Sequence, residues 1–328
     1  MLKKKHLLIV LSVLVVTLAF AGNTFAQKKF FAIATGGTGG TYYPLGGLLA
    51  QALTERVPNV VVTGQAGNAS VANCNLIKDH QIESAFVQNN VAYSAYEGKD
   101  QFAGKPVKNL RGIASLYPET IQIVARADSG IKSLKNVKSK RLIPGDRGSG
   151  TEVDTLNVLT AHGLTYKDFG GVDWLSFSGA AQRLQDKQAD ITFTTAGWPT
   201  AAITELAMST DIVLVPIDEA VINKITKTHA FYSKVVIPKG TYKGMTSDVA
   251  TITTMAQWVV DEKVHEELVY NLTKALWEKS KDGLSGADVM ARVHAKGKDV
   301  QLSTALSGMA IPLHAGAAKY YREKGLIK

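Results

Sequence analysis

Cysteine is almost absent from this chain, since Cys74 is the single one among 328 residues and no disulfide can form within the chain. The residues around Cys74 are mostly small or apolar, which indicates a buried side chain rather than a reactive thiol. A protein without disulfides depends on its hydrophobic core for stability, even in an oxidising compartment.

Long runs of charge are also missing. Lys and Arg together number 37 against 28 Asp and Glu, a formal net charge of +9, yet beyond the N-terminal segment the longest basic run is 138–141. Aromatic residues do not alternate with the basic ones. This pattern excludes a nucleic-acid-binding surface and indicates a generally basic protein that tolerates anionic ligands.

Groups for metal binding and covalent catalysis are sparse. The seven histidines are scattered, and His265 lacks the second histidine of a zinc pair on one helical face. Ser129 and Lys132 have the spacing of a serine–lysine acylation pair, but the rest of that signature is missing. We therefore expect a binding protein that is not an enzyme and has no cofactor or metal. A two-lobed enzyme acting on a small anionic metabolite is the alternative.

The N-terminal segment has the three parts of a secretory signal. Three lysines at 3–5 precede an apolar run over 7–20, and small residues at 24 and 26 mark a cleavage site. We predict a signal peptide over 1–26, removed on export to the periplasm of a Gram-negative type of cell. An uncleaved membrane anchor is the alternative, because the apolar run is only slightly shorter than a span.

Strand-like and helix-like segments alternate along the rest of the chain, which predicts an α/β architecture with mainly parallel sheets. A length of about 300 residues is long for one core and sufficient for two. The expected strands are 30–35, 60–65, 84–88, 110–116, 120–126, 141–143, 172–177, 191–195, 212–216, 231–237 and 247–254. The expected helices are 42–56, 70–78, 151–161, 179–185, 200–208 and 264–277.

The order of these segments predicts two lobes with a ligand cleft between them. Lobe I is expected to contain 27–120 and 236–328, and lobe II to contain 121–235. Two or more hinge strands, near 117–126 and 231–237, are expected to cross between the lobes.

Two glycine-rich turns stand where a strand passes into a helix. The first covers 35–44 and the second 144–151. Such turns leave backbone N–H groups free at the positive end of a helix, so each is a candidate anion site. Glycine permits close approach and positive φ, while a hydroxyl caps the helix or binds the ligand. The candidate ligand-binding residues in these turns are Gly37, Thr38, Gly39, Thr41, Tyr42, Ser149, Gly150 and Thr151.

Nucleotide sites are excluded by spacing. After Gly37 and Gly39 the chain lacks the third glycine of a dinucleotide fingerprint, and the turn at 148–151 lacks the lysine of a phosphate loop. Ser149 also lacks the glycine spacing of a nucleophile elbow.

Further candidates follow from the same sheet edge. Asn68, Ala69 and Ser70 open the helix after strand 60–65, and Gln88 ends the next strand, so these residues share the edge where ligands bind in open α/β sheets. Asn68 or Ser70 could instead serve only as a helix cap. Tyr117 and Trp198 lie beside crossing segments or turns, where an aromatic residue is more often part of a core.

Arg147 is the one cation inside either turn. Its guanidinium could pair with a ligand carboxylate, or with Asp146 or Glu152 beside it.

Five segments in order resemble the TAXI family of extracytoplasmic solute-binding proteins of TRAP transporters. They are 34–44, 67–73, 115–119, 148–151 and 311–321. The resemblance implies a two-lobed, periplasmic-binding-protein-like fold that closes on a small carboxylate of the 2-oxoglutarate or glutamate class. It places the contacts in 37–42, 68–70 and 149–151, without a single arginine clamp.

The resemblance also implies the partners. They are a small carboxylate solute and a membrane permease driven by an ion gradient, of the fused type with four-span and twelve-span parts. A monomer is expected, with a weak dimer as the alternative, and the protein meets the membrane only through the permease.

Overall fold

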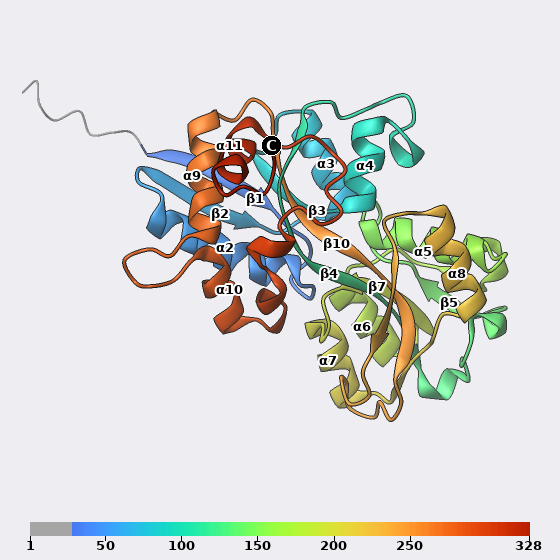
Figure 1. Ribbon diagram of the computed structural model, residues 1–328. Coiled ribbons are helices and arrows are strands. Elements are labelled where there is room, and N and C mark those ends of the chain that lie inside the picture. Colours follow the sequence, from blue (N-terminus) through green and yellow to red (C-terminus); the bar gives the residue numbers. More distant parts are fainter. Residues whose placement is uncertain (1–27) are drawn as a thin grey trace, which may run out of the picture.

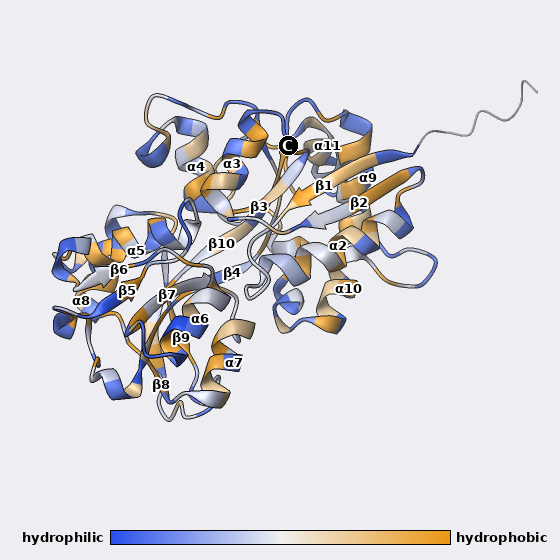
Figure 2. Cartoon of the chain, turned by 180° about the vertical axis from the view of Figure 1, so that it is seen from behind, coloured by the Kyte–Doolittle hydropathy of each residue, from blue (hydrophilic) through white to orange (hydrophobic). Residues whose placement is uncertain are grey.

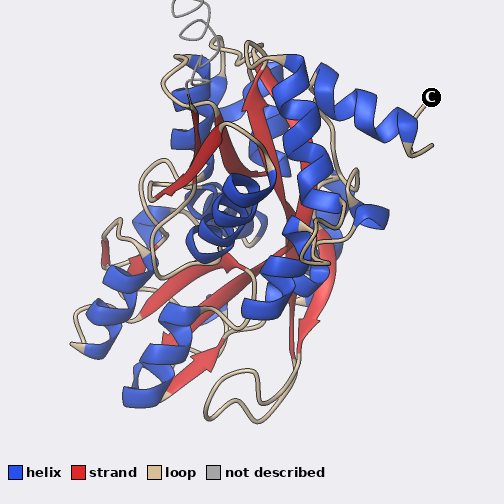
Figure 3. Ribbon diagram, turned by 90° about the vertical axis from the view of Figure 1, so that its left-hand side faces the viewer, coloured by secondary structure: helices blue, strands red, loops and turns tan. Residues whose placement is uncertain are grey.

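The computed structural model describes residues 28–328, so the predicted signal peptide lies outside the described residues (Figure 1). These residues form a ten-stranded sheet in the order β2-β1-β3-β10-β4-β7-β5-β6, with β8 paired to β4 and β9 paired to β10. Helices lie on both faces of the strands (Figure 3). The two-lobed α/β fold is confirmed.

Lobe I contains the first half of this sheet. Its parallel strands are β1 (Lys29–Ala34), β2 (Val60–Gln65) and β3 (Ser84–Gln88). Its helices are α2 (Tyr42–Arg56), α3 (Ser70–Lys78), α4 (Asn89–Glu97), α9 (Glu266–Trp277), α10 (Gly286–Val293) and α11 (Ala315–Glu323). Every residue of β3 is buried, as expected for a central strand covered on both faces.

Lobe II repeats the arrangement on the other half. Its strands are β5 (Arg141–Ile143), β6 (Gly171–Val172), β7 (Ile191–Ala196), β8 (Ile212–Leu214) and β9 (Ser233–Ile237). Its helices are α5 (Gly150–Ala161), α6 (Phe177–Gln185), α7 (Ala201–Ser209) and α8 (Glu219–Thr228). Short 3-10 turns at 100–102, 127–129, 134–136, 166–168, 295–299 and 302–304 complete the two lobes.

Apolar residues gather on the strands and on the inward sides of the helices, while many loops are polar (Figure 2). In lobe I the core includes the fully buried Trp258, Tyr117 and Phe86. In lobe II a separate cluster surrounds Phe193 and Ile123. Each lobe therefore has its own core.

Two long antiparallel strands, β4 (Leu110–Arg126) and β10 (Val249–Asp261), run through both lobes. The sequence predicted two separate strands around Pro118, but β4 is continuous. Pro118 is opposite Met255, and Ser115 is opposite Gln257, so β4 carries one extra residue here. A bulge accommodates proline, which has no N–H to donate to the ladder.

The second crossing differs from the prediction. Strand β9 pairs with the first five residues of β10, and Tyr242 and Val249 belong to an apolar cluster of lobe II. The chain therefore returns to lobe I within β10, near Thr254, and the segment 236–253 lies with lobe II. The segment 231–237, expected to cross between the lobes, contains β9, an edge strand of lobe II. It pairs with β10, and β10 is the strand that crosses.

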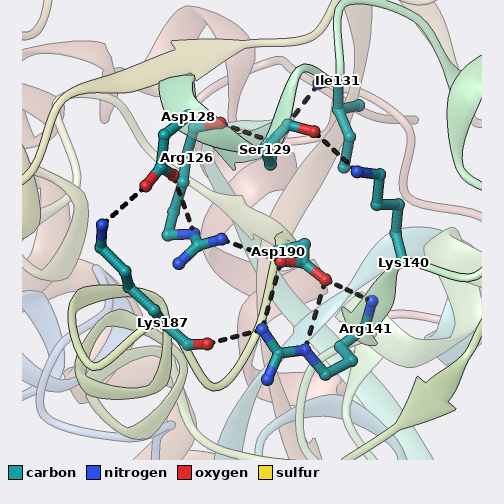
Figure 4. Close-up of polar contacts among 8 residues, drawn as sticks. All are labelled: Arg126, Asp128, Ser129, Ile131, Lys140, Arg141, Lys187 and Asp190. Carbon is teal, nitrogen blue, oxygen red and sulfur yellow. Dashed lines mark hydrogen bonds and ion pairs between the residues drawn. The ribbon is translucent and has the colours of Figure 1, made fainter.

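An ion-pair cluster joins the end of β4 to β5 in lobe II (Figure 4). Asp190 accepts hydrogen bonds from the backbone N–H of Arg141 (2.8 Å) and from Arg126 Nη2 (3.0 Å), and Lys187 Nζ pairs with Asp128 at 2.9 Å. Burial opposes ionisation of Asp190, but the hydrogen bonds and charge of Arg141, with the charge of Arg126, hold its pKa below the ordinary value. The cluster stabilises the lobe and lies apart from the cleft described below.

Within residues 28–328, no helix has both the length and the apolar character needed to cross a membrane.

Glycine allows α2 to pack closely on β2. A Cβ atom on Gly64 would lie 3.1 Å from the backbone nitrogen of Gly47 and 3.2 Å from the backbone carbon of Gly46. Backbone cannot give way as a flexible side chain can. The contact therefore requires glycine at position 64.

We predict that Gly64→Ala lowers the free energy of unfolding by about 1 to 3 kcal/mol through overpacking, measured by urea denaturation. Gly47→Ala is the matched control, because its Cβ would meet nothing within 4 Å. Alanine in a helix interior should raise stability by about 0.5 to 1 kcal/mol relative to glycine. Equal effects of the two substitutions would contradict the close packing of α2 on β2.

Candidate functional site

Loops and helix starts from both lobes enclose one cavity of about 50 Å³. Such a volume holds only a few non-hydrogen atoms of a solute or of water. The lining residues are Gly36, Gly37, Gly40, Thr41, Tyr42, Gly67, Asn68, Ala69, Ser70, Gln88, Glu119, Asp146, Ser149, Gly150, Thr151, Phe177, Thr195 and Ala196.

Helix starts from both lobes meet at this cavity. Helices α2 and α3 begin at Tyr42 and Ser70 in lobe I, and α5 and α6 begin at Gly150 and Phe177 in lobe II. The first N–H groups of a helix have no partner inside the helix and carry its partial positive charge. The cavity can therefore hold an anionic group without a basic side chain.

The two glycine turns use glycine for different reasons. In the second turn Gly145 and Gly148 have φ of 99° and 75°, a conformation that favours glycine. In the first turn glycine provides space, because a Cβ on Gly39 would lie 2.4 Å from Ser178 Oγ of lobe II. Ala69, at the start of α3, has φ of 63°, which is uncommon for a residue with a Cβ.

The two lobes touch across the cleft through main-chain atoms. The N–H of Ala72 donates to the carbonyl of Gly148 at 3.0 Å, and the N–H of Ala202 donates to the carbonyl of Gly39 at 3.2 Å. Thr41 Oγ1 donates to the Gly197 carbonyl at 3.2 Å. The structure therefore shows the closed arrangement of the lobes.

Most of the residues predicted from the glycine turns and the sheet edge lie around this cavity. They are Gly37, Thr41, Tyr42, Asn68, Ala69, Ser70, Gln88, Ser149, Gly150 and Thr151. The hydroxyl of Ser149 is occupied as the cap of α5, because it accepts from the N–H of Glu152 at 3.1 Å. Its contribution to the wall is therefore mainly structural.

Four other predicted residues do not line the cavity. Thr38 is exposed, and Gly39 packs against Ser178 and Ala202 instead. Tyr117 is fully buried in the core of lobe I. Trp198 packs beside the apolar cluster of lobe II, with Lys296 Nζ 4.3 Å from the centre of its ring.

Arg147 also does not line the cavity and is exposed. Its guanidinium carbon lies 3.6 Å from the centre of the Trp174 ring, so stacking replaces both pairings that the sequence suggested. Glu152 instead accepts from the Gly148 N–H at 2.9 Å and from Trp174 Nε1 at 2.6 Å. Arg147 therefore braces the outside of the second turn.

Sequence reasoning missed Glu119, which lines the cavity and is 2% exposed. Tyr42 Oη donates to Glu119 Oε2 at 2.7 Å. Burial, together with the nearby charge of Asp154, raises the pKa of Glu119 well above its ordinary value, although the Tyr42 hydrogen bond lowers it. Glu119 lies two residues after Tyr117, which was already a candidate. Because the sequence predicted a gap between two strands at Pro118, Glu119 was not placed on a strand that faces the cleft.

A second buried acid, Asp154, connects the lobes behind the cavity. From lobe I, Gln88 Nε2 and Asn90 Nδ2 donate to its carboxylate at 2.7 and 3.0 Å, and the Tyr232 hydroxyl donates from lobe II. Burial raises the pKa of Asp154 to about 6, opposed by the hydrogen bonds from Tyr232, Gln88 and Asn90. Gln88 therefore joins the cavity wall to a contact that holds the lobes together.

Comparison with known proteins identifies the family. A model described as the NMT1-like family matches residues 33–325, nearly all of the described chain. The chain belongs to the NMT1-like family.

Solved structures share the fold of this NMT1-like protein. PhnD1 from Prochlorococcus marinus (MIT 9301), in complex with methylphosphonate, has a TM-score of 0.53 at 10% identity, over 91% of this chain and 99% of that chain. A protein from Bordetella bronchiseptica RB50 has a TM-score of 0.54 at 13% identity, over 91% and 98% of the two chains. At such low identity these likenesses concern the fold alone.

The assignment to the TAXI family of TRAP receptors is wrong, because the matching family model is that of the NMT1-like family. The expectation of a fused, ion-driven TRAP permease rested on this assignment and is withdrawn with it. Two of the segments behind the resemblance are glycine and hydroxyl turns at helix starts, and a third opens another helix. Turns of this kind stand at helix starts in many unrelated folds, so they indicated the kind of site and not the family.

We predict that Asp154 makes stability pH-dependent. Because the folded pKa is raised, the stabilisation by protonation is complete below the ordinary value of 3.8 and is lost as pH rises through about 6. Relative to Asp154→Asn, the wild type should gain about 1 kcal/mol of unfolding free energy between pH 7 and pH 5. Urea denaturation at both pH values measures this difference, and a constant offset between the proteins would contradict the buried, titrating carboxyl.

Proposed function

We propose that this NMT1-like protein is the periplasmic solute-binding protein of a transporter. It captures a small carboxylate by closure of the lobes and presents the closed form to a membrane permease. The observation that carries the proposal is the convergence of helix starts from both lobes on one buried cavity.

The lining favours a single negative charge on the solute. It contains the acids Glu119 and Asp146 and, in the described chain, no Lys, Arg or His. Helix N-termini offer partial charges, which suit one carboxylate group, whereas a second full charge would find no cationic side chain in the lining. We therefore favour a monocarboxylate over the dicarboxylates 2-oxoglutarate and glutamate.

Closure follows from the arrangement of contacts. Asn68 and Ser70 belong to one wall of the cavity, and Gly150 and Thr151 to the other. A solute that touches both walls only when they meet binds the closed state more tightly and shifts the population toward it. The crossing strands β4 and β10 are the elements about which the lobes turn.

Thermal denaturation of the mature protein with a panel of solutes tests the proposal. The panel contains acetate, pyruvate and lactate, the dianions succinate and 2-oxoglutarate, and glutamate and methylphosphonate. A monocarboxylate at 100 times its dissociation constant should stabilise the protein by about 3 kcal/mol. A larger shift with the dianions would refute the preference for one charge. Turnover of any member would favour the alternative, an enzyme on the same fold.

We predict that Gly150→Ala prevents full closure. A Cβ at this position would lie 1.5 Å from Gln88 Oε1 and 2.9 Å from Ser70 Oγ of the opposite lobe, so the walls can meet only if the Gln88 amide leaves its hydrogen bond to Asp154. The stabilisation by the best solute of the panel should fall by more than half, while the fold stays intact by circular dichroism.

Gly171→Ala is the matched control in lobe II, because its Cβ would meet only Arg141 Cγ, at 3.8 Å. This variant should bind as the wild type does. If Gly150→Ala bound equally well, closure would not depend on the contact between Gly150 and Gln88.

A further inference from the structure

Glu119 occupies an unusual position in the cavity wall. Its side chain belongs to β4, is almost completely buried and faces a site that the helix starts make suitable for an anion. A carboxylate there would repel the carboxylate of the solute at short range in a water-poor site. A neutral Glu119 removes this repulsion.

The hydrogen bonds of Glu119 leave one oxygen available. Tyr42 Oη donates to Oε2, and Oε1 has no hydrogen bond to any residue of 28–328. A neutral carboxyl group matches this pattern, because its carbonyl oxygen accepts while its O–H donates. With Oε2 accepting from Tyr42, the proton belongs on Oε1, which is free to donate to a solute.

The groups around Glu119 supply no cation to hold it ionised. Tyr42 faces it from α2, Tyr117 from β4 itself, and Asp154 from α5. Asp146 lines the same cavity from the loop before α5. Opposite Glu119 in the ladder, β10 presents Thr254.

The 3-10 turn 295–299, which contacts β4, carries the buried basic side chain Lys296. It does not neutralise Glu119, because Lys296 Nζ pairs with Asp299 at 2.9 Å and lies over the Trp198 ring. β7 presents only Ala196 and Thr195 to the cavity.

The two buried acids differ in their partners. Asp154 receives three donated hydrogen bonds from Gln88, Asn90 and Tyr232, which stabilise its charged form. Glu119 receives one and lies beside Asp154 in the same buried region. When two interacting acids share such a region, the one with fewer donors keeps the proton.

We propose that Glu119 is a protonated carboxylic acid at neutral pH and donates a hydrogen bond from Oε1 to the anionic group of the solute. This inference deepens the proposed function by naming the donor that reads the anion. Binding is then sensitive to pH above neutrality, because loss of this proton places a carboxylate against the solute.

Carbon-13 NMR of the mature protein labelled at Glu Cδ tests the proton directly, with Glu119→Gln used to assign the resonance. At pH 7, Glu119 should keep the chemical shift of a neutral acid while the exposed glutamates show carboxylate shifts. The hydrogen bond from Tyr42 lowers the pKa of Glu119. In Tyr42→Phe this bond is absent, so the Glu119 transition should move to higher pH. A Glu119 resonance that titrates with the exposed glutamates would overturn the proposal.

Calorimetry with pyruvate and with alanine tests the donor. In Glu119→Gln the amide N–H₂ replaces the acid O–H, so pyruvate affinity at pH 7 should stay within about threefold of the wild type. Above the pH at which the NMR titration shows loss of the Glu119 proton, the variant should bind pyruvate better than the wild type does. If Glu119→Gln instead lost alanine binding while the wild type bound alanine well, Glu119 would be a carboxylate that pairs with an ammonium group, which overturns the proposal.

The two proposals fail in different ways. If neither protein bound pyruvate or any other member of the panel, the proposed function would fail, whereas the NMR titration would still decide whether Glu119 holds a proton.

Discussion

The antiparallel pairing of β4 with β10 is the constraint on which the rest of the structure depends. These strands belong to the cores of both lobes, so the lobes share a sheet as well as a cleft. Glu119 and Thr254 face each other in this ladder close to the crossing point. Any rotation of one lobe against the other therefore passes through the backbone that carries a cavity residue.

The positive potential in the cleft comes from main-chain groups and not from basic side chains of the described lining. The main-chain dipoles of four helix starts provide the positive potential. The ionisable side chains of the described lining are the carboxyl groups of Glu119 and Asp146 and the phenol of Tyr42. Because full positive charges are absent from the wall, the protonation of individual acids determines what the cleft accepts. Asp154 and Glu119 are neighbours with different donor sets, and this difference separates a structural role from a binding role.

Sequence reasoning found what depends on local pattern. The helices 42–56 and 70–78 and the strand 84–88 have the predicted bounds, because amphipathic periodicity and turn residues mark their ends. It missed α4, since Asn89 and Asn90 resemble a turn, although their amides serve contacts across the fold. It also missed Glu119 and Asp154, whose importance arises from partners more than sixty residues away or from burial that no local pattern reveals.

Two of the hydrogen bonds that join the lobes involve main-chain atoms alone, unlike those that Asp154 accepts from Gln88 and Asn90. Ala72 with Gly148, and Ala202 with Gly39, meet through peptide N–H and carbonyl groups. Substitutions of cavity side chains that leave the backbone in place therefore keep these two contacts. The solute preference can therefore change by substitution of cavity side chains while these two contacts, made when the lobes close, are kept in the descendants.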